Sequence, residues 1–465
     1  MTQHVLCIAF PAFGHIIPLL ELAKKMSNNF LVTFCVSEQK VTYIKERELL
    51  HGYGESIRML GLNDGVNENF DRLVSPEQMA GLVKSMEQAQ SDLLYGINPA
   101  NRSGGKDDSG LEPVSMVITD SMMYVPLKIC HERNIPCYVF NAASDKLMTG
   151  ILKINPSTKA RTSQDFHNGE ANENTDIGFA VEEQCLNWMY ELNHTWPLAA
   201  GVIHNSVREF EADAMLDFTN DPRFDNVPSY HVGPLLNDTT PGDQFALKSG
   251  RKRSPVSMTL AQKVQTWLDQ HDTQTLIYVS FGTLSLASAH QTKEIAVALL
   301  SLQVPFIWSL RESEHQHLPA DIQRKIKHQF DAPGGHFLVL PWVPQKLVLA
   351  HPATAVFVSH CGWNSTLEAV SSGVPVVAWP MYADQYMNAE FLEREAAAVK
   401  LEETGLNSTK VIAAVLLRDA ITTVYGDKEN ENRYRKAMER LQTVAGAAVA
   451  KGGSSVKDLM TLMGI

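Results

Sequence analysis

The stretch HCGWNSTLE, residues 360–368, lies between two segments with different patterns. The preceding run ATAVFVS is apolar and rich in β-branched residues, which predicts a buried strand. The following TLEAVSSG predicts a short helix that ends at Gly373. The stretch therefore marks a strand-to-helix connection that carries a histidine, a tryptophan, an asparagine, a serine and a glutamate.

Short apolar runs alternate with helical patterns through most of the chain. In the first half they are HVLCIAF, LVTFCVS, VSMVITD, CYVFNA and GVIHNS, and in the second half TLIYVSFG, PFIWSL, HFLVLPW, TAVFVSH and VPVVAWP. Their hydrophobicity is continuous rather than alternating, which is typical of strands buried on both faces. The sequence therefore predicts an α/β fold in which helices flank parallel sheets.

The length of 465 residues, 44% of them hydrophobic, is enough for two or three domains, and large α/β folds favour two. Residues 237–259 are rich in polar, glycine, proline and basic residues and show no periodicity, which predicts a linker. We expect an N-terminal domain over residues 1–240, a linker over 241–259 and a C-terminal domain over 260–439.

The balance of 40 Lys+Arg against 52 Asp+Glu gives a net charge of -12, which argues against nucleic acid or an anionic membrane as the main partner. The six cysteines are scattered without a C-x-x-C pair, which indicates reduced thiols. The first residues lack a signal-peptide pattern, and no apolar run approaches the roughly 20 residues of a membrane span. We expect a soluble, cytoplasmic monomer.

The strand-to-helix connection has the chemistry of an anion site. In parallel sheets ligands bind at the carboxyl ends of the strands, where the unpaired N–H groups of a helix start attract phosphate. Gly362 allows a close approach to the backbone, and Asn364, Ser365 and His360 add donors. Glu368, about one turn beyond Ser365, could accept hydrogen bonds from ribose hydroxyls. However, Ser365 and Glu368 also fit a capping box, which needs no ligand, so this stretch alone leaves both interpretations open.

Polar and aromatic residues also follow two neighbouring predicted strands. Trp342 and Gln345 come after HFLVLP, and Asp384 and Gln385 come after VPVVAWPMYA. A tryptophan face can stack on a base, which contributes roughly 1–3 kcal/mol, and an Asp-Gln pair can bind vicinal hydroxyls. Together with the anion site, these residues predict a nucleotide-sugar site.

The 44 residues WVPQKLVLAHPATAVFVSHCGWNSTLEAVSSGVPVVAWPMYADQ, 342–385, closely resemble the signature box of plant-type family 1 UDP-glycosyltransferases. Further similarity lies in PAFGHIIP, VITD, WLDQHDTQTLIYVSFGT and GPLL. The resemblance implies the GT-B fold, with two Rossmann-like domains that face each other across a cleft. The C-terminal domain would hold the donor, and the final helix, about residues 440–465, would cross back to pack on the N-terminal domain.

The resemblance also implies roles in donor binding. Trp342 would stack on uracil, the main chain of Val343 and the residues around Gln345 would contact the edge of the base, and Glu368 would bind the ribose. The diphosphate would be held by His360, Gly362, Asn364, Ser365, Gly282 and Thr283. The sugar hydroxyls would be bound by Trp363, Asp384 and Gln385.

Three positions of the resemblance bear on the donor in particular. A glutamine at the end of the box, here Gln385, is typical of glucose users, whereas galactose users tend to have histidine there. Val343 replaces the usual alanine, a change that a main-chain contact tolerates. Thr283 replaces the commoner serine and keeps the hydroxyl.

Glycosyl transfer needs a base that activates the acceptor hydroxyl, and near neutral pH a histidine suits this task. His15 follows the first predicted strand in FPAFGHIIP, and Asp120 ends VSMVITD, where its carboxylate could orient and charge-balance the imidazole. A packing role for His15 and an N-cap role for Asp120 are the alternatives. The resemblance favours a catalytic dyad, because both residues match the family's catalytic positions. Phe13 and Met122 are candidate walls of the acceptor pocket.

We therefore expect an inverting transfer of glucose from UDP-glucose to a small lipophilic acceptor such as a phenolic or flavonoid. No D-x-D pair ends a strand, and His315 and His317 lack a third ligand, so we expect no metal and no cofactor beyond the donor co-substrate. A protein that binds UDP-sugars without catalysis is the first alternative. A dinucleotide oxidoreductase is disfavoured, since Gly52-Tyr-Gly54 lacks the last glycine of the G-x-G-x-x-G motif.

Overall fold

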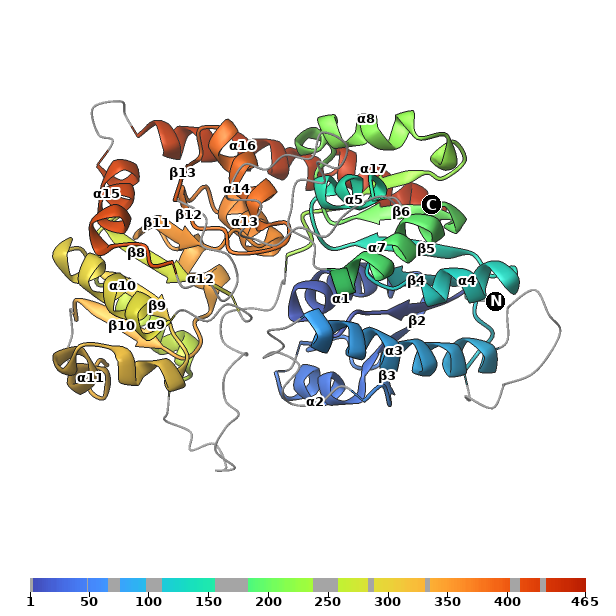
Figure 1. Cartoon of the computed structure of the whole chain (residues 1–465), viewed down its shortest axis with the longest axis horizontal. Helices are drawn as coiled ribbons and strands as arrows, with labels where there is room; N and C mark the ends of the chain where they lie inside the picture. Colours follow the sequence, from blue (N-terminus) through green and yellow to red (C-terminus); the bar gives the residue numbers. More distant parts are fainter. Residues whose placement is uncertain are drawn as a thin grey trace. The chain divides into compact units, whose positions relative to one another are not determined.

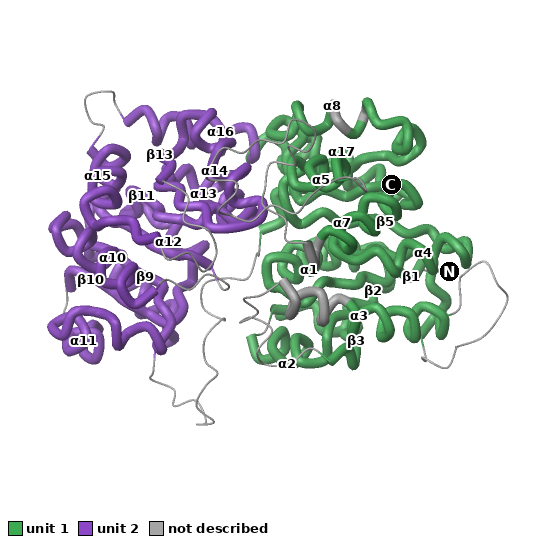
Figure 2. The backbone as a smooth tube through the Cα atoms, in the orientation of Figure 1, with its two compact units in different colours: residues 1–238, 446–465 green, residues 239–445 purple. Residues whose placement is uncertain are grey.

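The computed structural model describes residues 3–47, 49–65, 76–97, 111–154, 183–236, 258–282, 288–330, 335–401, 410–426 and 432–465. The chain divides into two compact units (Figure 2). Unit 1 comprises residues 1–238 and 446–465, and unit 2 comprises residues 239–445. Apart from its last two residues, the expected linker lies outside the described residues.

Unit 1 contains a parallel seven-stranded sheet in the order β3-β2-β1-β4-β5-β6-β7 (Figure 1). Its strands are β1 (His4–Ile8), β2 (Leu31–Ser37), β3 (Ile57–Leu62), β4 (Met116–Asp120), β5 (Cys137–Asn141), β6 (Gly201–His204) and β7 (Ser229–His231). The inner strands are buried along nearly their whole length, as continuous hydrophobicity predicts.

The helices of unit 1 connect and cover these strands. They are α1 (Phe13–Met26), α2 (Glu38–Glu46), α3 (Pro76–Gly96), α4 (Val125–Glu132), α5 (Asp145–Leu152), α7 (Glu183–Thr195), α8 (Ala212–Asn220) and α17 (Ser454–Met463). The apolar face of α1, including Ile16, Leu19 and Leu20, packs with Phe34 and Phe140 of the sheet in one buried core. This packing holds the start of α1 at the carboxyl edge of the sheet.

Unit 2 contains a parallel six-stranded sheet in the order β10-β9-β8-β11-β12-β13. Its strands are β8 (Leu276–Ser280), β9 (Phe306–Ser309), β10 (Phe337–Leu340), β11 (Thr354–Ser359), β12 (Val376–Ala378) and β13 (Ala398–Lys400). Its helices are α9 (Leu260–Leu268), α10 (Ala289–Ser301), α11 (Ala320–Ile326), α12 (Gln345–Ala350), α13 (Trp363–Ser371), α14 (Gln385–Arg394), α15 (Ala414–Tyr425) and α16 (Arg433–Val449).

The C-terminal segment forms two helices rather than one. At Gly453 an added Cβ would lie 2.2 Å from the Ala447 carbonyl oxygen, so the tight connection after α16 depends on glycine. The next helix, α17, belongs to unit 1, where Ser455 Oγ donates to the Gly233 carbonyl at 2.7 Å. Asp458 accepts a hydrogen bond from the His231 main-chain N–H at 2.8 Å. The prediction that the last helix packs on the N-terminal part is confirmed, with α17 as that helix.

The α/β architecture with two parallel sheets is also confirmed. Three strands that the sequence analysis does not predict, β3, β7 and β13, each lie at a sheet edge. Among the described helices, none is both long and apolar enough to cross a membrane.

Candidate active site

His15 and Asp120 meet at the carboxyl edge of the unit 1 sheet. His15 lies in the first turn of α1, directly after β1, and Asp120 is the last residue of β4, the strand paired with β1. His15 Nδ1 lies 2.9 Å from Asp120 Oδ2 and 3.1 Å from Oδ1. The carboxylate is fully buried, whereas 21% of the His15 side chain is exposed. The structure therefore joins a buried carboxylate to an imidazole that solvent can reach.

Neither residue serves as a helix cap. Ala12 is the N-cap of α1, and α4 begins only at Val125 with Tyr124 as its N-cap. Asp120 Oδ1 instead accepts the Met122 main-chain N–H at 2.9 Å, which orients the carboxylate. Because the carboxylate accepts from Nδ1, this nitrogen carries the proton of the neutral ring, and Nε2 is the basic atom.

A small pocket that is partly open to solvent lies beside this pair. Its lining residues are Phe10, Met86, Glu87, Gln90, Met122, Met123, Tyr124 and Val125. The Phe10 ring lies 5.2 Å from the His15 ring. Of the two predicted pocket walls, Met122 lines this cavity, whereas Phe13 packs against Tyr43 with ring centroids 4.1 Å apart. The cavity is mainly apolar and rich in methionine, which suits a lipophilic ligand.

In unit 2, two glycines enclose the His360 ring. Gly282, with φ of 71°, follows β8, and Gly362 follows β11 as the N-cap of α13. A Cβ at either glycine would lie 2.7 Å from His360 Nε2, so a larger residue there would force the ring to move. Burial lowers the pKa of His360 to about 4, so the ring is neutral at pH 7. The ring is thus held rigidly beside the start of α13.

The start of α13 matches an anion site better than a capping box. Gly362 is the N-cap of the helix, and Ser365 is its third residue. Ser365 therefore cannot be the capping residue, and the capping-box alternative is wrong. The main-chain N–H groups at the start of a helix, next to a glycine without a side chain, form the type of site that binds anions.

Gln345 forms hydrogen bonds to two residues of α13. Its Nε2 donates to Glu368 Oε2 at 2.6 Å and to Ser365 Oγ at 2.9 Å. The Tyr278 hydroxyl donates to Gln345 Oε1 at 3.1 Å, which fixes the orientation of the amide. Burial raises the pKa of Glu368. Tyr278 is not among the predicted site residues, because a tyrosine within a predicted strand has no signal that separates it from an ordinary core residue.

The other predicted donor residues follow the ends of β10, β11 and β12. Trp342 is half-buried and Val343 is buried, while Trp363 packs against Phe391. Asp384 accepts from Asn388 Nδ2 at 2.8 Å. Gln385 Oε1 accepts from the main-chain N–H groups of Met381 at 2.9 Å and Tyr382 at 3.2 Å, which fixes the orientation of the amide. Thr283 lies outside the described residues.

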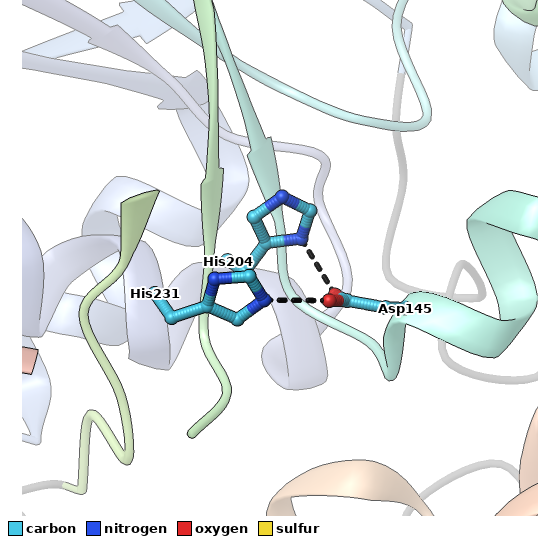
Figure 3. A group of neighbouring side chains, drawn as sticks. All are labelled: Asp145, His204 and His231. Atoms are coloured by element: carbon cyan, nitrogen blue, oxygen red, sulfur yellow. Dashed lines mark hydrogen bonds and ion pairs between the residues drawn. The ribbon is translucent and has the colours of Figure 1, made fainter. Parts of the chain in front are cut away.

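A second group of imidazoles and a carboxylate, Asp145, His204 and His231, is absent from the sequence predictions (Figure 3). His204 and His231 are register partners at the ends of β6 and β7, and Asp145 begins α5. Asp145 Oδ1 lies 2.6 Å from His204 Nδ1, and Oδ2 lies 2.7 Å from His231 Nε2. The two rings stack with centroids 4.5 Å apart.

The three side chains have the composition and spacing of a possible metal site. The ligand atoms of the three residues lie within 4.8 Å of one another. Coordination through His204 Nδ1 and His231 Nε2 would move the protons to the opposite ring nitrogens, both of which are buried without a partner among the described residues. A metal-bound imidazole normally donates its other N–H to an acceptor. The group therefore fits a hydrogen-bonded cross-link better than a metal site.

Comparison with known proteins agrees with this fold. A family model described as UDP-glucoronosyl and UDP-glucosyl transferase matches residues 250–435. UDP-glycosyltransferase 74C1 of Arabidopsis thaliana is 30% identical, over 98% of this chain and 97% of its own. UDP-glycosyltransferase 71K1 of Malus domestica is 35% identical over 74% of this chain and 72% of its own. The crystal structure of Medicago truncatula UGT71G1 complexed with UDP-glucose shares the fold with a TM-score of 0.77, at 22% identity and coverage of 100% and 98%.

The chain therefore belongs to the plant family 1 UDP-glycosyltransferases and has the GT-B fold, as the sequence predicts. It is a UDP-glycosyltransferase.

Proposed function

We propose that this enzyme transfers glucose from UDP-glucose to a hydroxyl of a small lipophilic acceptor such as a phenol, with inversion at the anomeric carbon. The observation that carries the proposal is the His15–Asp120 pair, a partly exposed imidazole held by a buried carboxylate beside a methionine-rich cavity. This is the arrangement that a general base for a lipophilic alcohol needs.

In the proposed step, His15 Nε2 takes the proton of the acceptor hydroxyl while Asp120 stabilises the imidazolium that forms. The acceptor oxygen bonds to the anomeric carbon as the bond from that carbon to the diphosphate oxygen breaks, and the electron pair leaves with UDP. A single displacement on an α-linked donor gives a β-glycoside.

For donor binding, we propose the roles that the family resemblance implies. Trp342 stacks on uracil, and Glu368, oriented by Gln345, accepts from the ribose hydroxyls. The helix start at Gly362, together with the neutral His360 ring, stabilises the negative charge that develops on the diphosphate. The Gln385 amide nitrogen then donates to the sugar, which favours glucose.

The relatives support a small-molecule acceptor but differ in which one they use. One is a flavonol 3-O-glucosyltransferase of Arabidopsis thaliana, 27% identical, and another is an indole-3-acetate beta-glucosyltransferase of Zea mays, 28% identical. A solved neighbour from Polygonum tinctorium is described as capable of glucosylating indoxyl. This diversity supports a lipophilic aromatic acceptor without selecting one.

The direct test incubates the purified protein with UDP-glucose and a panel of phenols and follows UDP release together with the mass of the glycoside. We expect UDP release that depends on the acceptor and a product with one added hexosyl unit. UDP-glucose binding by calorimetry with no UDP release for any acceptor would instead support a protein that binds UDP-sugars without catalysis.

We also propose a reducing compartment, the cytoplasm, as the site of action. The cysteines Cys7, Cys35, Cys130, Cys137 and Cys361 are buried and free, and burial raises the pKa of Cys7 and of Cys361 to about 12. Such thiols are protonated and unreactive. Thiol titration of freshly purified protein, unfolded without reductant, should find these five cysteines reduced.

A further inference from the structure

The cavity beside His15 and Asp120 contains one buried amide that the proposed reaction does not use. Gln90, on α3, lines the cavity and is only 1% exposed. Its Nε2 donates to Met123 Sδ at 3.1 Å, and its Oε1 is buried without a hydrogen-bond partner among the described residues. A buried carbonyl oxygen without a partner costs about 1–3 kcal/mol, so this oxygen favours any ligand that donates to it.

The orientation of the amide follows from its sulfur contact. A thioether sulfur is a weak acceptor, so it matches the amide NH₂ group and not the amide oxygen. The reverse orientation would place two acceptors against each other at Met123. The oxygen is therefore the atom without a partner, and the ligand group that satisfies it is a hydrogen-bond donor.

Other polar groups that line the cavity already have hydrogen-bond partners. The Tyr124 hydroxyl donates to Glu87 Oε1 at 2.5 Å, and both burial and this carboxylate raise the pKa of Tyr124. The Met122 carbonyl accepts from Trp188 Nε1 at 3.2 Å, which fixes the main chain of this wall. Around these groups lie Phe10 and methionines whose unbranched side chains can repack around an aromatic ring.

We propose that Gln90 is an acceptor-recognition residue, and that the preferred acceptors carry a second hydroxyl besides the one that is glucosylated. This inference rests on the proposed function and deepens it, since it selects aromatic diols over their monohydroxy analogues. The acceptor's first hydroxyl faces His15, and its second donates to Gln90 Oε1. A site built to bind a hydroxyl discriminates strongly against the analogue that lacks it, because the buried polar atom is then left unpaired.

The test compares three dihydroxybenzenes, catechol, resorcinol and hydroquinone, with their monomethyl ethers as acceptors. For at least one isomer we expect the wild-type kcat/KM to favour the diol by about tenfold, a ratio that corresponds to about 1.4 kcal/mol. Gln90→Leu should abolish this preference by lowering kcat/KM for the diol while leaving that for the ether within about twofold. Gln88→Leu is the matched control, because Gln88 lies on the same helix but is exposed, where it donates to Asp92.

Gln90→Met is a second variant in case the leucine packs poorly, since its unbranched side chain has a similar length. Its melting temperature should equal or exceed that of the wild type, because it removes a buried oxygen without a partner. Equal diol-to-ether ratios in wild type and both variants would overturn the inference and leave the proposed function intact. Failure of every acceptor with the wild type, despite UDP-glucose binding, would instead overturn the proposed function.

Discussion

Unit 1 holds two imidazole–carboxylate groups at the same edge of one sheet, and they differ in access. In the pair formed by His15 and Asp120, 21% of the histidine side chain is exposed. In the group formed by Asp145, His204 and His231, both histidines are 1% exposed and the aspartate is fully buried. Asp145 also accepts from Asn141 Nδ2 at 3.2 Å.

The difference in burial separates a reactive group from a structural one. Burial lowers the pKa of His204, and although burial alone would raise the pKa of Asp145, the two histidines bring it below the ordinary value. An ionised carboxylate that accepts from both rings ties the ends of β6 and β7 to the start of α5. A closed group of this kind has no route for a substrate proton, whereas the ring of His15 does. We therefore propose that the same chemistry supports catalysis at His15 and the stability of the fold at Asp145.

Removing the exposed imidazole should give the largest effect. His15→Ala should lower kcat/KM by roughly 10²–10⁴-fold, the usual contribution of a general base. Its melting temperature and UDP affinity should stay close to wild type, because the side chain is partly exposed and unit 2 contains the donor residues. His51→Ala, at an exposed histidine of unit 1, is the control. An undiminished rate in H15A would refute the assignment of the base.

The same substitution at the two carboxylates should give opposite results. Asp145→Asn replaces one acceptor of the buried group with a donor, so we expect a loss of about 3 kcal/mol in the free energy of unfolding, with activity per folded molecule within about twofold. Asp120→Asn should instead impair catalysis far more than it lowers stability. Chemical denaturation and steady-state kinetics on both variants measure the two effects. Loss of activity in folded D145N would break the distinction.

The pH dependence of the free energy of unfolding should reveal the protonation state of the buried residue Glu211. Burial, together with the negative charge of Asp145, raises the pKa of Glu211 to about 8, and Ser206 Oγ donates to Glu211 Oε1 at 2.8 Å. The protonated form is thus favoured in the folded state. Its stabilising contribution is complete below the unfolded value of about 4.5 and is lost as pH rises through about 8. The slope is at most about 1.4 kcal/mol per pH unit.

Glu211→Gln keeps the hydrogen-bonding shape and removes this titration. The melting temperature of the wild type should therefore fall relative to that of E211Q between pH 5 and pH 8, as measured by calorimetry at constant ionic strength. Parallel curves for the two proteins would show that Glu211 is ionised in the fold at neutral pH.

How well the sequence predicts a strand depends on whether that strand is buried in the interior of its sheet or lies at an edge. The interior strands are predictable because each buries a continuous apolar run, as β1 and β11 do. β3, β7 and β13 escape prediction because each leaves positions half-buried or exposed at a sheet edge. β10 is also an edge strand, yet its four residues are buried, and its apolar run is recognisable.

A candidate site can be predicted from the sequence only where the strands that form it can be predicted. His15 and Asp120 adjoin interior strands, so their meeting can be predicted, and most of the proposed donor residues share one contiguous segment, residues 342–385. The group at Asp145 requires β7 to pair with β6, and the sequence does not reveal β7. Similarly, nothing in the sequence shows that Tyr278 reaches Gln345 from another strand.

Substitution of Tyr278 should give the smallest effect. In its burial and its contacts this residue is intermediate between the two imidazole groups. It is buried like His204, yet its hydroxyl donates to Gln345, which in turn donates to Glu368. Tyr278→Phe removes one hydrogen bond and leaves the ring stacked on Phe357 with centroids 4.9 Å apart. Because a hydrogen bond of this kind contributes about 0.5–1.5 kcal/mol, we expect KM for UDP-glucose to rise about three- to fivefold, with kcat and the acceptor KM unchanged. Tyr425→Phe, at a half-buried tyrosine in the same unit, is the control. A lower melting temperature with an unchanged KM for UDP-glucose would show that Tyr278 has a structural role. A higher KM with an unchanged melting temperature would show that a fully buried side chain can support substrate binding through a neighbouring residue.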